Sequence, residues 1–481
     1  MKKIIEIIQE KWLKDTTKTI ILVTMLFICF IGINILIQKL DLQDIDITKN
    51  KIFTLSEISK KQIENIDEKV TMYLVGISEN TSLVDLAKQY TKQNKNIKIE
   101  VIEDIGKRAD LKSKYDITDQ TQMIIVETDE RNKLLTIDEL YTYDYTTYQQ
   151  IDVSEEKLTN AICDITISQK PKIYFLTGHN EYSLNSELTI LKAYLTNEIN
   201  DGENLDLLVK GEIPQDADLI VIGSPQKDFI EQEVQIITTY IERGGKILWM
   251  NDPTLTEKSF PNIQKILDQF GINFQQGIIL EQDENKMAMQ APNYIIPSIN
   301  ITKATKDIAT DGGILLINAS KITLAEDEKM EELNVTSQII LTTSNKALYR
   351  TQTDNTSNYK IPSDEEGNFI LGVKLEKKIE EEKNSTLYAI SSNFFIVDYP
   401  ITIGDSQISP IYFYNNKDYI LNTIAELTNK ESTISIRKDT GVVTYTATQN
   451  QDKIIKIAII IYPILIITIG FIVWYIRRRK K

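Results

Sequence analysis

Four polar residues each follow an apolar run within five positions, and they are His179, Glu181, Ser224 and Asp252. The runs are typical of buried parallel strands and cover residues 172–176, 218–222 and 246–250. In open α/β sheets, ligands bind outside the carboxyl ends of the strands. The sequence therefore predicts a polar crevice at one edge of a sheet, lined by these four side chains.

Hydrolytic chemistry is the most demanding use of such a crevice. A nucleophile elbow has the pattern Gly-x-Ser-x-Gly, whereas this chain has Gly223-Ser224-Pro225 at the corresponding turn. Pro225 also lacks the N–H group that an oxyanion hole would use. We therefore expect no catalytic residue here and predict a crevice for a small molecule, a peptide, a glycan or a partner loop.

A structural explanation of the same residues stays open. In that explanation Gly178 permits the turn, Glu181 caps the start of the following helix and His179 lies on the surface. The chain holds 1 His and 2 Cys, too few to supply the four ligands of a structural zinc site. We expect no metal and no cofactor.

The elements that position these residues follow from hydrophobic spacing. Ile230, Val234, Ile237 and Ile241 recur at intervals of three and four residues, which predicts a helix between two of the strands. Gly244-Gly245 is typical of a helix C-terminus. A second helix is predicted after His179, with Leu184, Leu188, Leu191 and Leu195 on one face. Parallel strands joined by helices predict an α/β domain, to which we assign residues 169–450.

Residues 38–168 are predicted to form a separate α/β domain with the element order βαβαββα. That order resembles a thioredoxin-like domain, but the turn Ile77–Asn80 contains no CxxC pair for redox chemistry. Tyr141–Tyr148 holds four tyrosines, which suit either a stacking surface or an extended linker, and we favour the linker. The charged run Leu375–Lys383 is interpreted as a solvated turn or helix.

Both ends of the chain carry long apolar runs. Residues 19–37 and 457–476 contain no charged side chain and are long enough to cross a bilayer as helices. Basic residues occur in 1–18 and in 477–481, so the positive-inside rule predicts cytoplasmic termini and a large extracytoplasmic region in a two-pass membrane protein. A cleaved signal peptide is the alternative for the first run, and a buried core helix is the alternative for either. The formal net charge of −15 argues against nucleic acid as a partner.

Several stretches, in this order, resemble the GldG-like, gliding-motility-type auxiliary components of ABC transporters. They are Phe53–Ser56, Phe175–Glu181, Asp218–Pro225, Tyr240–Lys246, Asp252-Pro253, Asp418–Asn422 and the terminal apolar span that ends in Arg477-Arg478. The resemblance implies a class I glutamine-amidotransferase-like (flavodoxin-like) parallel-sheet domain that lacks the catalytic cysteine of that class. Here Cys163 precedes the predicted sheet, and no cysteine follows the strand that ends at Ile222.

The resemblance also implies a separate ABC permease and an ATP-binding subunit as partners. This chain contains no Walker A motif, so we do not expect it to hydrolyse the nucleotide itself. The expected function is therefore a non-catalytic, membrane-anchored accessory subunit of an ABC transport system. Two alternatives stay open: a membrane-tethered hydrolase or amidotransferase-like enzyme, and a sensor.

Overall fold

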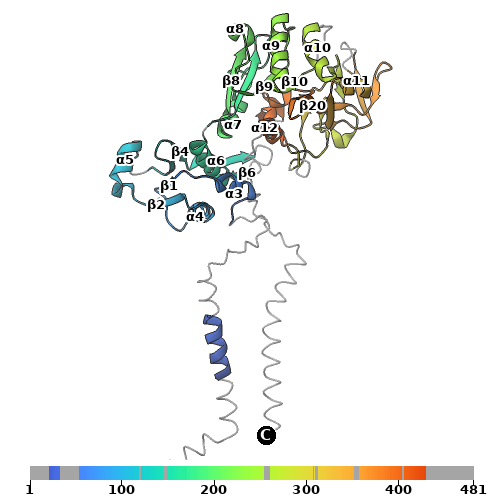
Figure 1. Cartoon of the computed structure of the whole chain (residues 1–481). Helices are drawn as coiled ribbons and strands as arrows, with labels where there is room; N and C mark the ends of the chain where they lie inside the picture. Colours follow the sequence, from blue (N-terminus) through green and yellow to red (C-terminus); the bar gives the residue numbers. More distant parts are fainter. Residues whose placement is uncertain are drawn as a thin grey trace, which may run out of the picture.

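The computed structural model describes residues 21–32, 54–118, 121–144, 149–167, 169–253, 260–306, 308, 312–351, 357–403 and 406–428. Residues 54–167 and 169–428 form two α/β domains, each with a mixed sheet (Figure 1). Of the predicted larger domain, 429–450 lie outside the described residues.

The smaller domain has a four-stranded sheet in the order β2-β1-β3-β4. β1 and β2 are parallel, whereas β3 and β4 are antiparallel to their neighbours. The elements are α3 (Glu57–Glu64), β1 (Val70–Val75), α4 (Ser82–Gln93), β2 (Ile97–Ile102), α5 (Ala109–Tyr115), β3 (Met123–Glu127), β4 (Asn132–Thr136), β5 (Tyr141–Asp144), β6 (Gln149–Asp152) and α6 (Ser154–Thr166). From β1 onward, the predicted order βαβαββα is confirmed, with the β5–β6 hairpin inserted before α6.

The two faces of the smaller sheet bury different side chains because residues alternate along a strand. Met72 and Leu74 of β1 pack with α3, α4 and α6, while Tyr73 and Val75 pack with α5. In the tyrosine stretch predicted as a linker, Tyr141 and Tyr143 lie on strand β5 with exposed side chains. Residues 145–148 of that stretch lie outside the described residues.

The larger domain contains a sheet of ten strands. Its parallel half has the order β8-β7-β9-β10-β21, and β20, β17, β16 and β11 continue it in antiparallel fashion. The parallel strands are β7 (Lys172–Thr177), β8 (Asp201–Asp206), β9 (Ala217–Gly223), β10 (Lys246–Met250) and β21 (Lys383–Ile390). The others are β11 (Ile272–Phe274), β14 (Ser298–Ile299), β16 (Ile322–Leu324), β17 (Val335–Thr342) and β20 (Ile370–Glu380).

Helices cover both faces of this sheet and create two cores. α7 (Thr189–Asn197) and α12 (Asn416–Leu427) pack on the face that carries Phe175 and Val221. α9 (Glu231–Glu242) and α10 (Pro261–Leu267) pack on the face that carries Ile222 and Trp249. The remaining elements are α8 (Leu207–Lys210), α11 (Asp327–Glu332), β12 (Ile278–Leu280), β13 (Tyr294–Ile295), β15 (Leu316–Ile317), β18 (Ala347–Arg350), β19 (Glu365–Gly367), β22 (Ile401–Ile403) and β23 (Ser406–Ile408).

Three expectations for the larger domain are wrong in detail. The sheet is mixed rather than parallel throughout. The charged run 375–383 belongs to the β20–β21 hairpin, whose strands alternate buried residues such as Leu375 with solvated charges. The helix expected from Leu184 begins only at Thr189, where the Asp398 carboxylate accepts hydrogen bonds from the Thr189 and Ile190 N–H groups.

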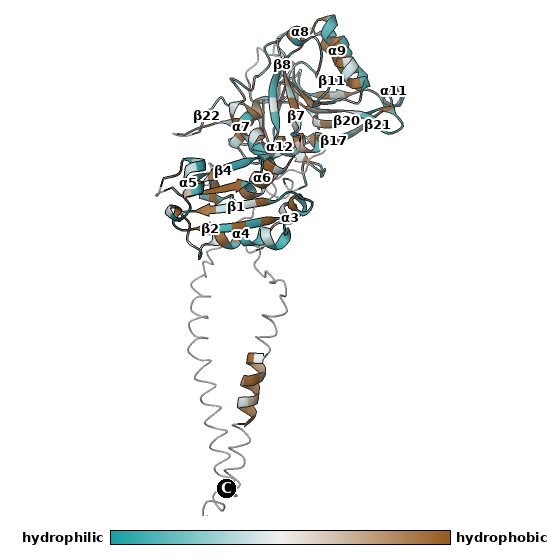
Figure 2. Ribbon diagram, turned by 60° about the vertical axis from the view of Figure 1, so that its left-hand side comes forward, coloured by the Kyte–Doolittle hydropathy of each residue, from teal (hydrophilic) through white to brown (hydrophobic). Residues whose placement is uncertain are grey.

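Among the described residues, no helix combines the length and apolar character needed to cross a membrane. Residues 21–32 of the predicted span 19–37 form a helix with exposed, mostly apolar side chains, and the ribbon of this helix is largely brown in Figure 2. The predicted span 457–476 and both basic ends, 1–18 and 477–481, lie outside the described residues.

Candidate functional site

Three of the predicted crevice residues, His179, Glu181 and Ser224, lie at the point where the strand order of the parallel half reverses. Numbered along the chain, these strands occur in the order 2-1-3-4-5, and the reversal lies between β7 and β9. The turns that follow these two strands contact one another: the Gln226 N–H donates to the His179 carbonyl at 2.8 Å. His179 and Ser224 are therefore positioned at the carboxyl edge as the sequence predicted.

His179 lies between two glutamates. Its Nε2 is 3.1 Å from Oε2 of Glu233, and its Nδ1 is 3.6 Å from Oε1 of Glu181. Both carboxylates also accept backbone hydrogen bonds, Glu181 from the His179 N–H at 2.7 Å and Glu233 from the Ile230 N–H at 2.9 Å. The ring of Phe229 meets the imidazole edge-on at 4.9 Å. The cluster thus ties the β7 turn to the first turn of α9.

Ser224 and Asp252 form a second group. The Ser224 Oγ accepts a hydrogen bond from the Asp252 N–H at 2.6 Å. Oδ1 of Asp252 accepts from the N–H groups of Asn393 and Phe394 at 2.7 and 2.8 Å, just beyond the end of β21. Asp252 therefore joins the ends of β9, β10 and β21.

Burial dominates the electrostatics of both groups. It raises the pKa of Glu181, whose carboxyl is also near that of Glu233. It likewise raises the pKa of Asp252, although hydrogen bonds from Asn393, Phe394, Ser224 and Tyr182 oppose the rise. Burial and the neighbouring Asp252 raise the pKa of Tyr182. The carboxyl groups of Glu181 and Asp252 are thus held away from water rather than open to a ligand.

The geometry does not align these residues for nucleophilic catalysis. Each imidazole nitrogen of His179 faces a glutamate, and the Ser224 Oγ already accepts a backbone hydrogen bond. A serine nucleophile requires a base within hydrogen-bond reach of its hydroxyl. His179, Glu181 and Ser224 are 6%, 8% and 3% exposed, so all three side chains are buried at the carboxyl edge of the sheet.

Sequence reasoning missed Glu233, Tyr182 and Asn393. Glu233 is the third residue of α9, and an acidic residue there is a recognised helix-start signal; its contact with His179 depends on tertiary structure. The side-chain amide of Asn393 is fully buried and hydrogen-bonds to no other described residue. A Cβ at Gly223 would lie 2.9 Å from the Asn393 Nδ2, so a larger residue there would force the Asn393 side chain to shift.

Cavities occur elsewhere in the described parts of the chain. One of about 600 Å³ lies beside β11, and another of about 620 Å³ lies between α3, the end of α6 and Ile199. None of the four predicted residues lines either of them. The described residues contain no cluster of three or more His, Cys, Asp or Glu side chains arranged to hold a metal ion.

A family model described as an ABC-type uncharacterized transport system matches residues 170–423, just over half of the chain. No curated protein sequence matches this chain. Among solved structures, the mmIFT52 N-terminal domain is 14% identical with a TM-score of 0.38, over 53% of this chain and 97% of that domain. A ThuA-like protein from Bacteroides uniformis is 10% identical with a TM-score of 0.31, over 54% of this chain and 93% of that protein. At these scores the similarity supports no statement about function.

Proposed function

The chain belongs to the ABC-type uncharacterized transport system family, as an auxiliary component, and on that premise we propose that it is a membrane-anchored accessory subunit without catalytic activity of its own. Its partners are an ABC permease and an ATP-binding subunit. Within that family, its sequence resembles the GldG-like, gliding-motility-type auxiliary components.

The observation that carries the non-catalytic part of the proposal is the pairing at the carboxyl edge. His179 is held by Glu181 and Glu233, while Ser224 and Asp252 bond to one another and to the backbone. A hydrolytic site would instead hold the imidazole against the serine hydroxyl. These hydrogen bonds and ion pairs stabilise the loops that follow β7, β9, β10 and β21.

Membrane anchoring is proposed from the two apolar runs, 19–37 and 457–476. The exposed apolar side chains of helix 21–32 suit a lipid environment better than water. With basic residues at both ends, the termini are cytoplasmic and the two α/β domains extracytoplasmic.

The finer fold assignment is also a proposal. The strand order β2-β1-β3-β4, with α5 alone on one face, supports a thioredoxin-like smaller domain. The parallel order β8-β7-β9-β10-β21 supports a flavodoxin-like or glutamine-amidotransferase-like larger domain. The first lacks a CxxC pair, and the second has serine where a catalytic cysteine would follow β9. Both domains then serve as docking or binding modules, for a partner loop or for a small molecule, a peptide or a glycan.

One observation favours the enzyme alternative. Ser224 has a φ of 52°, in the left-handed region, directly after β9. A strained turn after a strand is also where α/β-hydrolases hold their nucleophile. That alternative needs the imidazole to leave the two glutamates and reach the Ser224 Oγ.

Two sets of variants separate the proposals, with expression verified in each. The accessory role predicts that Ser224→Ala keeps most of the transport-dependent phenotype, whereas unrelated apolar helices in place of 19–37 or 457–476 abolish it. An enzyme predicts the reverse: complete loss with Ser224→Ala and little effect of the helix exchange, provided that the chain stays anchored.

A further inference from the structure

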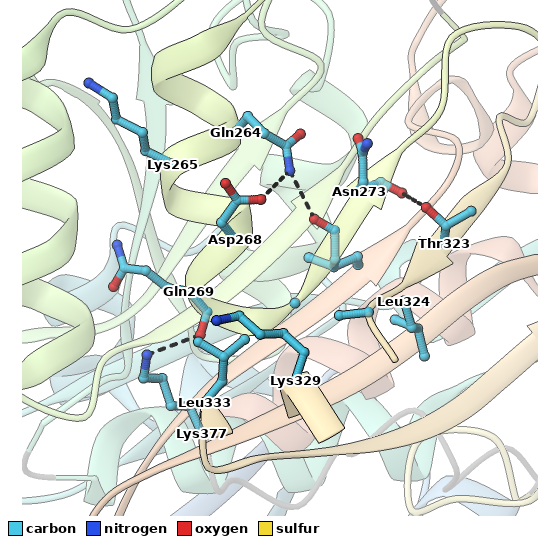
Figure 3. A pocket seen from close by; sticks show the side chains of 13 residues that line it. Gln264, Lys265, Asp268, Gln269, Asn273, Thr323, Leu324, Lys329, Leu333 and Lys377 are labelled. Atoms are coloured by element: carbon cyan, nitrogen blue, oxygen red, sulfur yellow. Dashed lines mark hydrogen bonds between the residues drawn. The ribbon is translucent and has the colours of Figure 1, made fainter. Parts of the chain in front are cut away.

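The cavity beside β11 combines an unpaired strand edge with a cluster of positive charge (Figure 3). It lies where β11 and β16 diverge from the outer part of β20, between α10 and α11. We call it the β11 cavity; the residues on which the argument rests are Gln264, Lys265, Asp268, Ile272, Lys329 and Lys377. A volume of about 600 Å³ is within the range of ligand sites in proteins.

β11 is the last strand of its sheet on this side. Gly271 accepts from the Ala325 N–H and Gln275 donates to the Lys321 carbonyl, both at 2.8 Å. In an antiparallel pair, bonded and non-bonded positions alternate, so Ile272 and Phe274 direct their N–H and C=O groups away from β16. Those outward groups pair with no other strand among the described residues.

At Ile272 the outward edge faces the cavity. Among the described residues, the Ile272 carbonyl accepts a hydrogen bond only from the side-chain amide of Gln264, at 3.3 Å, which is long for an N–H···O bond. Gln264 and Ile272 both line the cavity. An incoming backbone N–H can therefore take this position from the Gln264 amide, which has a second and shorter bond to Asp268 at 2.7 Å.

Positive charge dominates the lining. Three lysines (Lys265, Lys329 and Lys377) oppose one carboxylate, Asp268, in a chain with a net charge of −15. Lys265 and Lys329 form exposed ion pairs with Glu231 and Glu332, and such pairs contribute little free energy, so these lysines can turn toward a ligand.

Lys377 is the lysine best placed to hold an anion. Its Nζ donates to the Gln269 carbonyl at 3.0 Å, and within the described part of the chain it has no ion pair. Burial lowers its pKa, and the neighbouring Glu242 carboxylate opposes this shift.

We infer that the β11 cavity binds an extended acidic peptide segment of a partner protein. The segment adds a strand to the free edge of β11, and its carboxylates bind Lys377 and Lys329. Strand addition supplies backbone hydrogen bonds, and the flanking side chains supply specificity. The inference does not depend on a transport role, since it concerns only the surface of this chain.

The test uses the full chain in lipid nanodiscs and a fluorescein-labelled peptide of alternating glutamate and valine, with anisotropy as the readout. We expect saturable binding that Lys377→Gln weakens by at least about fivefold, because a charge-assisted hydrogen bond is lost. Lys329→Gln weakens it less. Lys346→Gln, outside the cavity, is the matched control and leaves binding unchanged.

Two further peptides separate strand addition from non-specific attraction. A peptide with glutamine in place of glutamate tests the charge, and one with a central proline tests the backbone N–H groups. The inference requires that both bind at least about fivefold more weakly, as expected for lost charge-assisted and backbone hydrogen bonds. Three results would overturn the inference. The proline peptide could bind as tightly as the acidic peptide, or Lys346→Gln could weaken binding as much as Lys377→Gln does. The third is that the acidic peptide does not bind at about 1 mM, far above the range of specific recognition.

Discussion

Nε2 of His179 lies 3.1 Å from Oε2 of Glu233, so the only histidine of the chain joins the turn after β7 to the first turn of α9. The side chain of His179 is 8% exposed and that of Glu233 is 1% exposed. The same glutamate oxygen also accepts a hydrogen bond from the Ile230 N–H. The position that looked most catalytic in the sequence therefore connects two elements of the fold.

Removing this imidazole should destabilise the larger domain. His179→Ala leaves two buried carboxylates without their shared partner, and we expect a loss of about 2–3 kcal/mol in the free energy of unfolding. His179→Gln, which keeps one donor, should lose less. Denaturant unfolding of the detergent-solubilised chain measures both, and a loss below about 0.5 kcal/mol in His179→Ala, as at an ordinary surface position, would show that the contact is unimportant.

Glu181 should make stability depend on pH. Burial raises the pKa of its carboxyl in the folded state, so between the unfolded and folded pKa values the folded chain binds more protons. Its contribution to stability is therefore greatest below about pH 4, near the unfolded pKa, and falls as pH rises through the folded pKa. Glu181→Gln should remove this component, and its stability relative to the wild type should increase over that interval. A difference that is constant with pH would contradict the raised pKa.

Asp252 should matter as a hydrogen-bond acceptor. Its Oδ1 accepts the N–H groups of Asn393 and Phe394, so Asp252→Ala leaves two buried donors unsatisfied and should cost about 2–4 kcal/mol. Asp252→Asn offers an oxygen in the same place and should cost less than half as much. Equal losses in thermal or denaturant unfolding would mean that the charge, rather than the acceptor, is what the site requires.

The sequence predicted most elements because their periodicity is local. The helix face of Val234, Ile237 and Ile241 and the strand around Ile220 depend only on nearby residues, and both are present in the structure. β8 was missed because Asp201–Asp206 is polar and occupies an edge of the sheet. The helix before Thr189 was overextended because its cap, Asp398, comes from a distant part of the chain.

The candidate site was predicted only in part for the same reason. Strand ends located His179, Ser224 and Asp252 at one edge of the sheet. Their bonds to Glu233 and Asn393 arise from tertiary packing, and no spacing in the sequence encodes them. With those bonds, His179, Glu181 and Ser224 are buried in the structure.

Topology can be tested with single cysteines in a background that lacks the two native ones, Cys29 and Cys163. Lys98 lies exposed on β2, so Lys98→Cys should react with a membrane-impermeant maleimide in intact cells. Lys14→Cys, in the basic N-terminal segment, should react only after the cells are permeabilised. Labelling of Lys14→Cys in intact cells, or protection of Lys98→Cys there, would contradict the proposed orientation.

The central claim is that this chain works as part of an ABC transport complex, and affinity purification of the intact protein in mild detergent tests it most directly. Mass spectrometry of the purified material should recover an ABC ATPase and a multi-span permease in near-stoichiometric amounts. A variant with unrelated apolar helices at 19–37 and 457–476 should lose them while keeping its own yield. Purification of the chain alone, with normal yield and both domains folded, would contradict the accessory role and favour a tethered enzyme or a sensor.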